Sequence, residues 1–385
     1  MLDHLSLHSL FNSYKTDALF HRYITNEHIE PILKVVSKNF DVATVGHSVN
    51  GLPIYGIQLG NGSKKVLMWS QMHGNESTTT KACFDLLNYL VDNEDLLKKC
   101  KLYIIPILNP DGAKSYTRLN ANNIDLNRDA QDLTQPESVV LKKVFETFKP
   151  DFCFNLHGQR TIFSAGNINK SATVSFLAPA QDKKCTVTKT RQIAMEIIAS
   201  MNKMLQNVIL NSVGIYDDAF NINCVGDTFQ SKNVPTVLFE AGHYKDDYSR
   251  EEVRIMIFGS LLIALETISE NENLGAKFEE YFDIPKNEKL FYDIIIRNAK
   301  VLTNSEEKEL DIAIQYEEVL ADGCIHFMPK IKKFGNLSMF FGHKEVDVKN
   351  QQVTLGGNLS LEMENAIDFV TINNELFSLK LVNNY

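Results

Sequence analysis

The stretch SQMHGNEST, residues 70–78, places a histidine and a glutamate three positions apart directly after an apolar run. A loop or helix cap accounts for its Gly, Asn, Ser and Thr, but it does not need His73 or Glu76. A second histidine, His157, ends the short apolar run FNLHG. Zinc sites that do chemistry commonly use two histidines and one carboxylate and leave a fourth position for water. His73, Glu76 and His157 would supply that set.

A second polar stretch, ILNPDGAKSYTRLNANNIDLNRD, covers residues 107–129. Arg128 could bind a carboxylate through two parallel hydrogen bonds, Asn127 could support it, and Arg118 lies a few residues upstream. Each residue taken alone also has a plain structural explanation. A single arginine is usually on the surface, and Glu76 suits the positive end of a helix dipole.

Strand-like apolar runs alternate with helical patterns around these residues. Helices are expected at 26–38, 77–99, 136–148, within 187–210, and at 249–269; strands are expected at 40–46, 52–60, 64–71, 101–110, 151–158 and 235–243. A proline in the first turn and a Ser-x-x-Glu capping box at 249–252 mark two helix starts. The alternation predicts an α/β fold with a mixed, mostly parallel sheet flanked by helices. In such folds, sites usually lie at the carboxyl ends of strands.

The composition changes after about residue 269. A polar stretch is followed from Leu290 by strand-like runs alone. We therefore expect a catalytic domain at 1–284 and a C-terminal all-β domain at 285–385, a small sandwich or barrel of unknown role, with the boundary near Ile284.

The composition also excludes some classes of protein. The chain has 385 residues and a net charge of −9, which argues against a nucleic-acid binder. The longest apolar stretch, 255–268, is too short to span a bilayer and is expected to be a buried helix. No signal peptide is visible, and six scattered cysteines predict reduced, buried thiols, so we expect a cytoplasmic protein without a membrane partner. The oligomeric state stays open.

The motifs HGNE, NPDG, TRLNANNIDLNRD, NLHG and VLFEAG follow one another over about residues 42–266. This order resembles the zinc metallocarboxypeptidases of the carboxypeptidase A-like superfamily, bacterial type. HxxE alone is weak, but NPDG together with R-x-N-x-x-x-x-D-L-N-R is specific. The resemblance implies zinc-dependent hydrolysis of a C-terminal peptide bond.

The resemblance assigns His73, Glu76 and His157 as ligands of one zinc ion. Asp125 matches the position that orients the first ligand histidine and fixes its tautomer. Cobalt or nickel would bind the same ligand types.

The resemblance also implies roles in substrate binding and catalysis. Asn127 and Arg128 would clamp the free carboxylate of the substrate. Arg118 would polarise the scissile carbonyl and stabilise its oxyanion. Glu240, at the end of PTVLFE, would be the general base.

The family also uses a loop tyrosine, for which Tyr216 is the candidate here. Its loop departs from the digestive-type pattern, and the residue that sets specificity is expected within 222–227. His243 matches no family ligand and is interpreted as a neighbour of the site or a hydrogen-bonded loop histidine.

Two alternatives stay open. The succinylglutamate desuccinylase and aspartoacylase relatives also carry HGNE and a DLNR-like segment and append a small β domain, so an N-acyl amino acid deacylase is the first alternative. The second is a non-catalytic carboxypeptidase-like binding protein. In the two catalytic cases the substrate is a peptide or an acyl amino acid with a free carboxylate.

Overall fold

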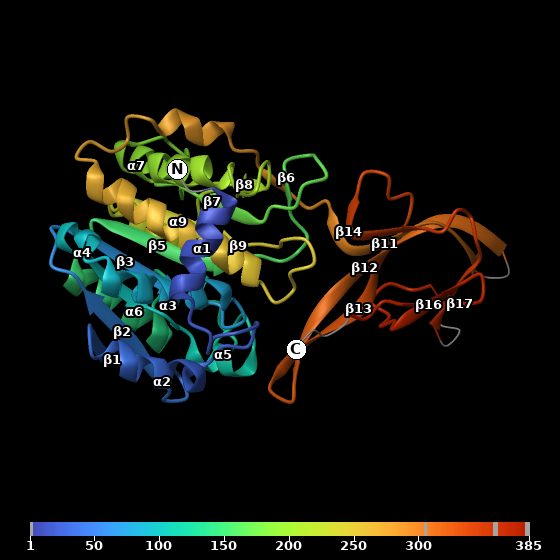
Figure 1. Cartoon of the computed structure of the whole chain (residues 1–385), viewed down its shortest axis with the longest axis horizontal. Coiled ribbons are helices and arrows are strands. Elements are labelled where there is room, and N and C mark those ends of the chain that lie inside the picture. Colours follow the sequence, from blue (N-terminus) through green and yellow to red (C-terminus); the bar gives the residue numbers. More distant parts are fainter. Residues whose placement is uncertain (1–2, 304–305, 357–360, 382–385) are drawn as a thin grey trace. The chain divides into compact units, whose positions relative to one another are not determined.

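The computed structural model describes residues 3–303, 306–356 and 361–381, and the chain forms two compact units (Figure 1). The first unit comprises Met1–Gln159 and Ala172–Asn287, and the second comprises Arg160–Ser171 and Glu288–Tyr385. The second switch, after Asn287, lies three residues from the boundary expected after Ile284. The first unit is therefore interrupted by the segment Arg160–Ser171, which the sequence reading did not separate from it.

An eight-stranded sheet forms the centre of the first unit, with the order β1-β2-β4-β3-β5-β9-β7-β8. Its strands are β1 (Asp41–His47), β2 (Pro53–Leu59), β3 (Lys64–Ser70), β4 (Cys100–Ile105), β5 (Phe152–Gly158), β7 (Val174–Leu177), β8 (Val213–Ile215) and β9 (Thr236–Ala241). The four central strands β4, β3, β5 and β9 are parallel. Antiparallel pairing joins β1 to β2, β2 to β4, and β7 to β9. The predicted mixed α/β sheet is confirmed.

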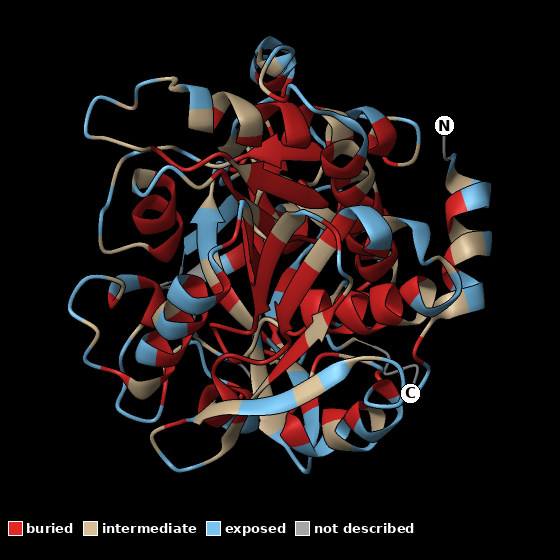
Figure 2. Ribbon diagram, turned by 90° about the vertical axis from the view of Figure 1, so that its left-hand side faces the viewer, coloured by how far each residue is buried: buried red, intermediate tan, exposed pale blue. Residues whose placement is uncertain are grey.

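Helices cover both faces of this sheet. They are α1 (His4–Tyr14), α2 (Asn26–Val36), α3 (Thr78–Asp92), α4 (Asp95–Lys99), α5 (Pro110–Ser115), α6 (Pro136–Phe148), α7 (Lys189–Leu205), α8 (Val225–Ser231) and α9 (Glu251–Glu270), with the short 3-10 helices η1 (Leu126–Arg128) and η2 (Phe278–Asp283). The alternation of side chains along β3 feeds two cores. Val66 and Met68 pack with α1, α3, α7 and α9, whereas Leu67 and Trp69 pack with α6 and α8. Figure 2 shows these strands buried between the helices.

Two expected helices differ from the structure in detail. The helix expected at 77–99 breaks at Asn93, whose non-helical φ and ψ of −124° and 61° end α3. The amide of Asn93 donates to the Tyr89 carbonyl at 2.9 Å, a local bond that competes with helix continuation. The long apolar stretch is the buried helix α9, as expected.

The capping box expected at the start of α9 is wrong. The N-cap is Arg250, in the left-handed region at φ 61°, and its side chain makes no cap bond. Asp247 does the capping instead, because its carboxylate accepts from the backbone N–H of Glu251 at 2.9 Å and of Val253 at 3.1 Å.

All six cysteines are free, but they are not all buried as expected. Cys185 and Cys224 are half-buried, and Cys324 is exposed. In the described ranges, no helix combines the length and the apolarity that crossing a membrane requires.

The second unit is built from strands. A four-stranded sheet has the order β13-β12-β11-β14, and a three-stranded sheet has the order β15-β16-β17. Their bounds are β11 (Phe291–Thr303), β12 (Glu306–Ala321), β13 (Cys324–Gly335), β14 (Phe341–Asp347), β15 (Val353–Leu355), β16 (Phe369–Ile372) and β17 (Glu375–Ser378), with short strands β6 (Ser164–Ala165) and β10 (Asn287–Glu288). Both sheets bury side chains in one core, as Ile296, Ile314, Leu355 and Val370 show.

The segment Arg160–Ser171 belongs to this β unit through its hydrogen bonds. The backbone N–H of Phe291 donates to the Ile162 carbonyl at 3.1 Å. The buried amide of Gln315 donates to the Thr161 hydroxyl at 2.6 Å.

Candidate metal centre and catalytic site

The predicted site residues meet at the carboxyl ends of three neighbouring parallel strands. His157 on β5 lies opposite Glu240 on β9 in the strand register. The other neighbour of β5 in the sheet is β3. His73 follows the end of β3. Because parallel strands end at the same edge of the sheet, residues from far apart in the chain become neighbours here.

The loop after β3 is shaped by Gln71, a residue that the sequence analysis did not single out. Gln71 has a positive φ of 43° and turns the chain as the strand ends. Its buried amide donates to the carbonyls of Ile24 at 3.0 Å and of Gly74 at 2.8 Å. The Thr80 hydroxyl donates to its carbonyl oxygen at 2.8 Å. Gln71 therefore joins both ends of the HGNE turn.

The NPDG motif supports the same loop. Asn109 caps α5 by accepting from the Gly112 N–H at 2.9 Å, and its amide donates to the Met72 carbonyl at 3.2 Å. Gly74 lies so close to α5 that a Cβ there would come within 1.9 Å of the Gly112 carbonyl carbon. Only glycine permits this approach, which explains the glycine between the two candidate ligands.

His73, Glu76 and His157 form one cluster. A ligand atom from each lies within 4.8 Å of the others. Nδ1 of His73 is 2.9 Å from Oε1 of Glu76 and 3.1 Å from Nδ1 of His157. Nδ1 of His157 is 2.9 Å from Oε2 of Glu76. Both imidazole rings are almost fully buried.

Asp125 determines how this cluster can be protonated. Its Oδ1 lies 3.0 Å from Nε2 of His73 and can only accept, so Nε2 carries the hydrogen. In the neutral ring, Nδ1 of His73 is then a lone pair that faces Glu76 and His157. Lone pairs aimed at one point repel each other unless a cation lies between them. The donor set therefore fits a divalent metal such as zinc.

The pKa shifts of the three candidate ligands also favour a bound cation. Burial lowers the pKa of His73, but the carboxylates of Glu76 and Asp125 outweigh it and raise the pKa to about 9. Burial raises the pKa of Glu76, yet the two histidines hold it well below its usual range. Burial lowers the pKa of His157, which keeps that ring neutral. The cluster favours positive charge at its centre.

Arg118 and Glu240 flank the cluster from two sides. Nε and Nη2 of Arg118 donate to Oδ2 of Asp125 at 3.1 and 3.0 Å, and Nη1 lies 3.6 Å from Glu76. Oε2 of Glu240 is buried without a hydrogen-bond partner among the described residues. Burial, reinforced by Glu76, raises the pKa of Glu240 well above its usual value. A buried carboxylate is costly, so its place beside the cluster suggests a function.

The two clamp candidates lie on η1, directly after Asp125. The Asn127 side chain accepts from the Val225 N–H at 3.0 Å, which ties it to the start of α8. Arg128 is exposed, and its Nη1 donates to the Asn127 carbonyl at 2.7 Å and lies 3.2 Å from Sγ of Cys224.

Tyr216 lies near Glu240 and Glu76. Burial raises the pKa of its hydroxyl, and the charges of Glu240 and Glu76 raise it further, an effect that requires proximity. Its backbone N–H donates to Phe176 on β7, which pairs with β9. His243 is buried, and its ring centroid lies 4.7 Å from that of Tyr248.

Arg250 is a second residue that the sequence analysis missed. Its buried guanidinium donates through Nη2 to the Gln159 carbonyl at 2.6 Å and through Nη1 to the Ala241 carbonyl. These carbonyls follow His157 and Glu240, so Arg250 joins the ends of β5 and β9. Its sequence context, a serine and two glutamates, resembles an ordinary helix start and gives no signal of this role.

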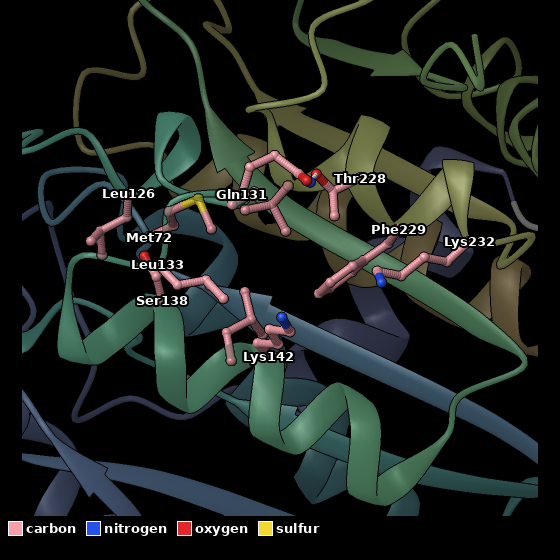
Figure 3. A pocket seen from close by; sticks show the side chains of 12 residues that line it. Met72, Leu126, Gln131, Leu133, Ser138, Lys142, Thr228, Phe229 and Lys232 are labelled. Carbon is pink, nitrogen blue, oxygen red and sulfur yellow. Dashed lines mark hydrogen bonds between the residues drawn. The ribbon is translucent and has the colours of Figure 1, made fainter.

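A small cavity of about 60 Å³ lies between residues of η1, α6 and α8 (Figure 3). Met72, Leu126 and Val225 line it, and each is adjacent in sequence to a site residue or bonded to one. The Gln131 amide donates to the Thr228 hydroxyl at 2.8 Å across its wall. The cavity therefore backs the site, while the candidate ligands lie outside its lining.

Comparison with known proteins supports this assignment. Residues 26–141 match the zinc carboxypeptidase family, a stretch that contains His73, Glu76, Arg118 and Asp125. Carboxypeptidase SOL1 of Arabidopsis thaliana is 28% identical over 163 residues, which cover 35% of this chain and 33% of that protein. Carboxypeptidase M of Mus musculus is 28% identical over 181 residues, 38% of this chain and 41% of that protein. The chain thus spans less than half the length of these relatives.

The fold has counterparts among solved structures. Carboxypeptidase A from Helicoverpa armigera superposes with a TM-score of 0.52 at 16% identity, over 69% of this chain and 80% of that one. At this identity the likeness concerns the fold alone.

Proposed function

We propose that the protein is a zinc-dependent hydrolase that removes the C-terminal residue of a peptide, since residues 26–141 match the zinc carboxypeptidase family. The observation that carries the proposal is the convergence of His73, Glu76 and His157, with Nε2 of His73 held by Asp125. This set leaves three lone-pair donors facing one point, next to a buried carboxylate on β9.

His73 and His157, through Nδ1, and Glu76 would hold the zinc ion. A zinc ion held there supplies Lewis-acid polarisation of a carbonyl and lowers the pKa of a bound water to about 7. Asp125 keeps Nδ1 of His73 free for the metal by holding the proton on Nε2.

Glu240 takes the part of the general base. Its carboxylate is buried at the strand end opposite His157, so it can accept a proton from the attacking water and deliver it to the leaving amine. Burial raises the pKa of Glu240, which favours the protonated form from which the carboxyl delivers its proton to the leaving amine. Arg118 donates to the carbonyl oxygen as negative charge develops on it.

Arg128 binds the free carboxylate of the substrate. Arg128 is exposed, and it ends η1, whose N-cap is Asp125. Asn127, anchored to α8, supports the clamp, and Tyr216 is the candidate for the loop tyrosine. A planar guanidinium recognises a carboxylate through two parallel bonds, which explains a requirement for a free C-terminus.

Glu240→Gln tests the assignment of the base. The amide keeps the shape of the side chain but cannot accept the proton, so turnover should fall at least about a hundredfold while the metal content stays unchanged. Released amino acids and bound zinc are measured on the same sample. Turnover equal to the wild type would exclude Glu240 as the base.

A substrate panel separates the peptidase from the deacylase alternative. Peptides with free and with amidated C-termini are compared with N-acetyl-aspartate and N-succinyl-glutamate. We expect cleavage of free peptides only. Cleavage of the acyl amino acids alone would replace the carboxypeptidase proposal, and binding of peptides without any cleavage would favour a non-catalytic protein.

A further inference from the structure

A second cluster of metal-ligating side chains lies on helices α1 and α9. His4 and His8 are one helical turn apart on α1, and Glu252 is in the first turn of α9. A ligand atom from each lies within 4.8 Å of the others. Nε2 of His8 is 3.3 Å from Oε2 of Glu252, and the two imidazole rings stack with centroids 4.2 Å apart.

This cluster is held in place by the packing between the two helices. Leu7 and Phe11 are buried and lie on the same face of α1 as the histidines. The Phe11 ring meets Phe258 of α9 edge-on at 5.8 Å. Leu7 packs against Gly259, where a Cβ would come within 2.9 Å of it. The apolar contacts therefore fix the histidines opposite the first turn of α9.

The chemistry of the cluster suits a borderline divalent ion. Two histidines four positions apart on a helix can bind one metal ion from the same face, and a carboxylate completes a three-ligand set. Tetrahedral zinc at about 2.0–2.1 Å from each ligand requires ligand atoms about 3.3 Å apart. The His8–Glu252 distance already meets this spacing, and Nε2 of His8 is buried without a hydrogen-bond partner among the described residues.

We propose that His4, His8 and Glu252 bind a second divalent ion, with Zn²⁺ as the expected occupant. The ion pins α1 to α9, so it links the N-terminal helix to the helix that follows the strand of Glu240. This site does not depend on the proposed function, since it shares no residue with the His73 cluster and lies on a different pair of elements.

The test counts zinc ions bound to the full chain. The protein is stripped with a chelator, dialysed against excess Zn²⁺ and then against buffer, and analysed by mass spectrometry of the metal. We expect two ions per wild-type chain and one ion in His8→Gln and in Glu252→Gln, which remove ligands from different helices. His157→Gln should also lose one ion, and the His8→Gln, His157→Gln double variant should bind none.

A second measurement follows thermal unfolding. Zn²⁺ should raise the Tm of His157→Gln, which keeps the α1–α9 cluster, and should leave the double variant unchanged. His47→Gln, at an exposed histidine of β1, is the matched control and should keep two ions. Equal ion counts in the wild type, in His8→Gln and in Glu252→Gln would overturn the proposal, whether or not the His73 cluster binds an ion.

Discussion

His73 makes contacts of two kinds with its two ring nitrogens. Nε2 donates to Asp125, and Nδ1 faces the other two candidate ligands. Asp125 in turn accepts from the Asn127 N–H at 2.9 Å and from Arg118. One carboxylate thus contacts the candidate ligand His73, Arg118 and the start of η1.

Asp125→Asn should therefore weaken metal binding without unfolding the protein. The neutral amide no longer fixes the proton on Nε2 of His73, and loss of such a partner typically lowers metal affinity by about 10–100-fold. Competition between the apo-protein and a chromophoric zinc chelator measures the change. Asp92→Asn, at an exposed position on α3, should leave the affinity unaltered. Equal affinities for both variants would remove Asp125 from this role.

Asp227 predicts a pH dependence of stability. Burial raises its pKa from 3.8 to about 6, so the folded state binds more protons than the unfolded state between those values. Its contribution to stability is therefore greatest below about pH 4 and is lost as the pH rises to about 6. Asp227→Asn should be more stable than the wild type by about 2 kcal/mol at pH 7 and equal to it near pH 4. Denaturant unfolding at both pH values decides; a constant difference would contradict the assignment.

The residue types and their order predicted which side chains would meet, because each candidate ligand follows or ends a strand of strong apolar pattern. They could not predict Gln71 or Arg250. Both act through hydrogen bonds to backbone carbonyls, and any residue can offer a carbonyl, so no pattern of residue types reveals the partner. No pattern of residue types predicts the positive φ of Gln71 either.

At the scale of elements, α3 and α9 are joined by a fully buried ion pair. Asp85 accepts from Nε and Nη2 of Arg254, both at 2.6 Å, and from the Thr16 N–H at 2.8 Å. Both side chains have no exposed surface. The pair fixes the relative position of two helices that cover the sheet beneath the site.

Asp85→Asn should destabilise the protein by about 3–5 kcal/mol, because it removes the carboxylate that Nε and Nη2 of the buried Arg254 contact and leaves only Glu251, at Nη1, as a charged partner. The double variant Asp85→Leu, Arg254→Met should lose less stability than Asp85→Leu alone or Arg254→Met alone. Denaturant unfolding of the two single variants and of the double variant measures the coupling between the two residues. Asp95→Asn, which breaks the exposed pair with Lys98, should change stability by less than about 1 kcal/mol. Additive losses in the double variant would refute the coupling.

Element types followed from periodicity, but element ends did not. The apolar spacing of residues 77–99 continues past Asn93, so the sequence predicts one helix. In the structure, α3 ends there, where the Asn93 side chain bonds to Tyr89. At α9, the Ser-x-x-Glu motif is present, but Asp247 lies nearer to the free N–H groups and takes the cap. Which of two candidate residues caps a helix depends on where the fold places their side chains, and the local sequence does not specify that.

At the scale of the whole molecule, the second unit depends on a segment from the middle of the chain. The all-β character of residues after 288 was readable from alternation. The membership of Arg160–Ser171 was not, because it rests on contacts such as Thr161 to Gln315 between residues more than a hundred positions apart.

An isolated fragment 288–385 should therefore be less stable than the same unit in the full chain. Without residues 160–171, the Phe291 N–H loses its partner and the Gln315 amide keeps only Asp293, and an unsatisfied buried group costs about 1–3 kcal/mol. Fusing residues 160–171 to the fragment through a flexible linker should restore part of the loss. The midpoint of denaturant unfolding is compared for the three proteins; identical midpoints would contradict the prediction.

The path of the chain has a mechanical consequence. The chain leaves the first unit at Arg160, three residues after His157, and returns at Ala172 into β7, where Ser175 lies opposite Glu240. The second unit is thus joined to the first by three covalent crossings, after Gln159, Ser171 and Asn287; the first follows β5, the strand of the candidate ligand His157, and the second leads into β7, which pairs with the strand of Glu240. A force applied to the second unit, whether by a bound macromolecule or by thermal motion, can reach the first unit along the chain only through these three crossings, and two of them adjoin strands at the candidate site.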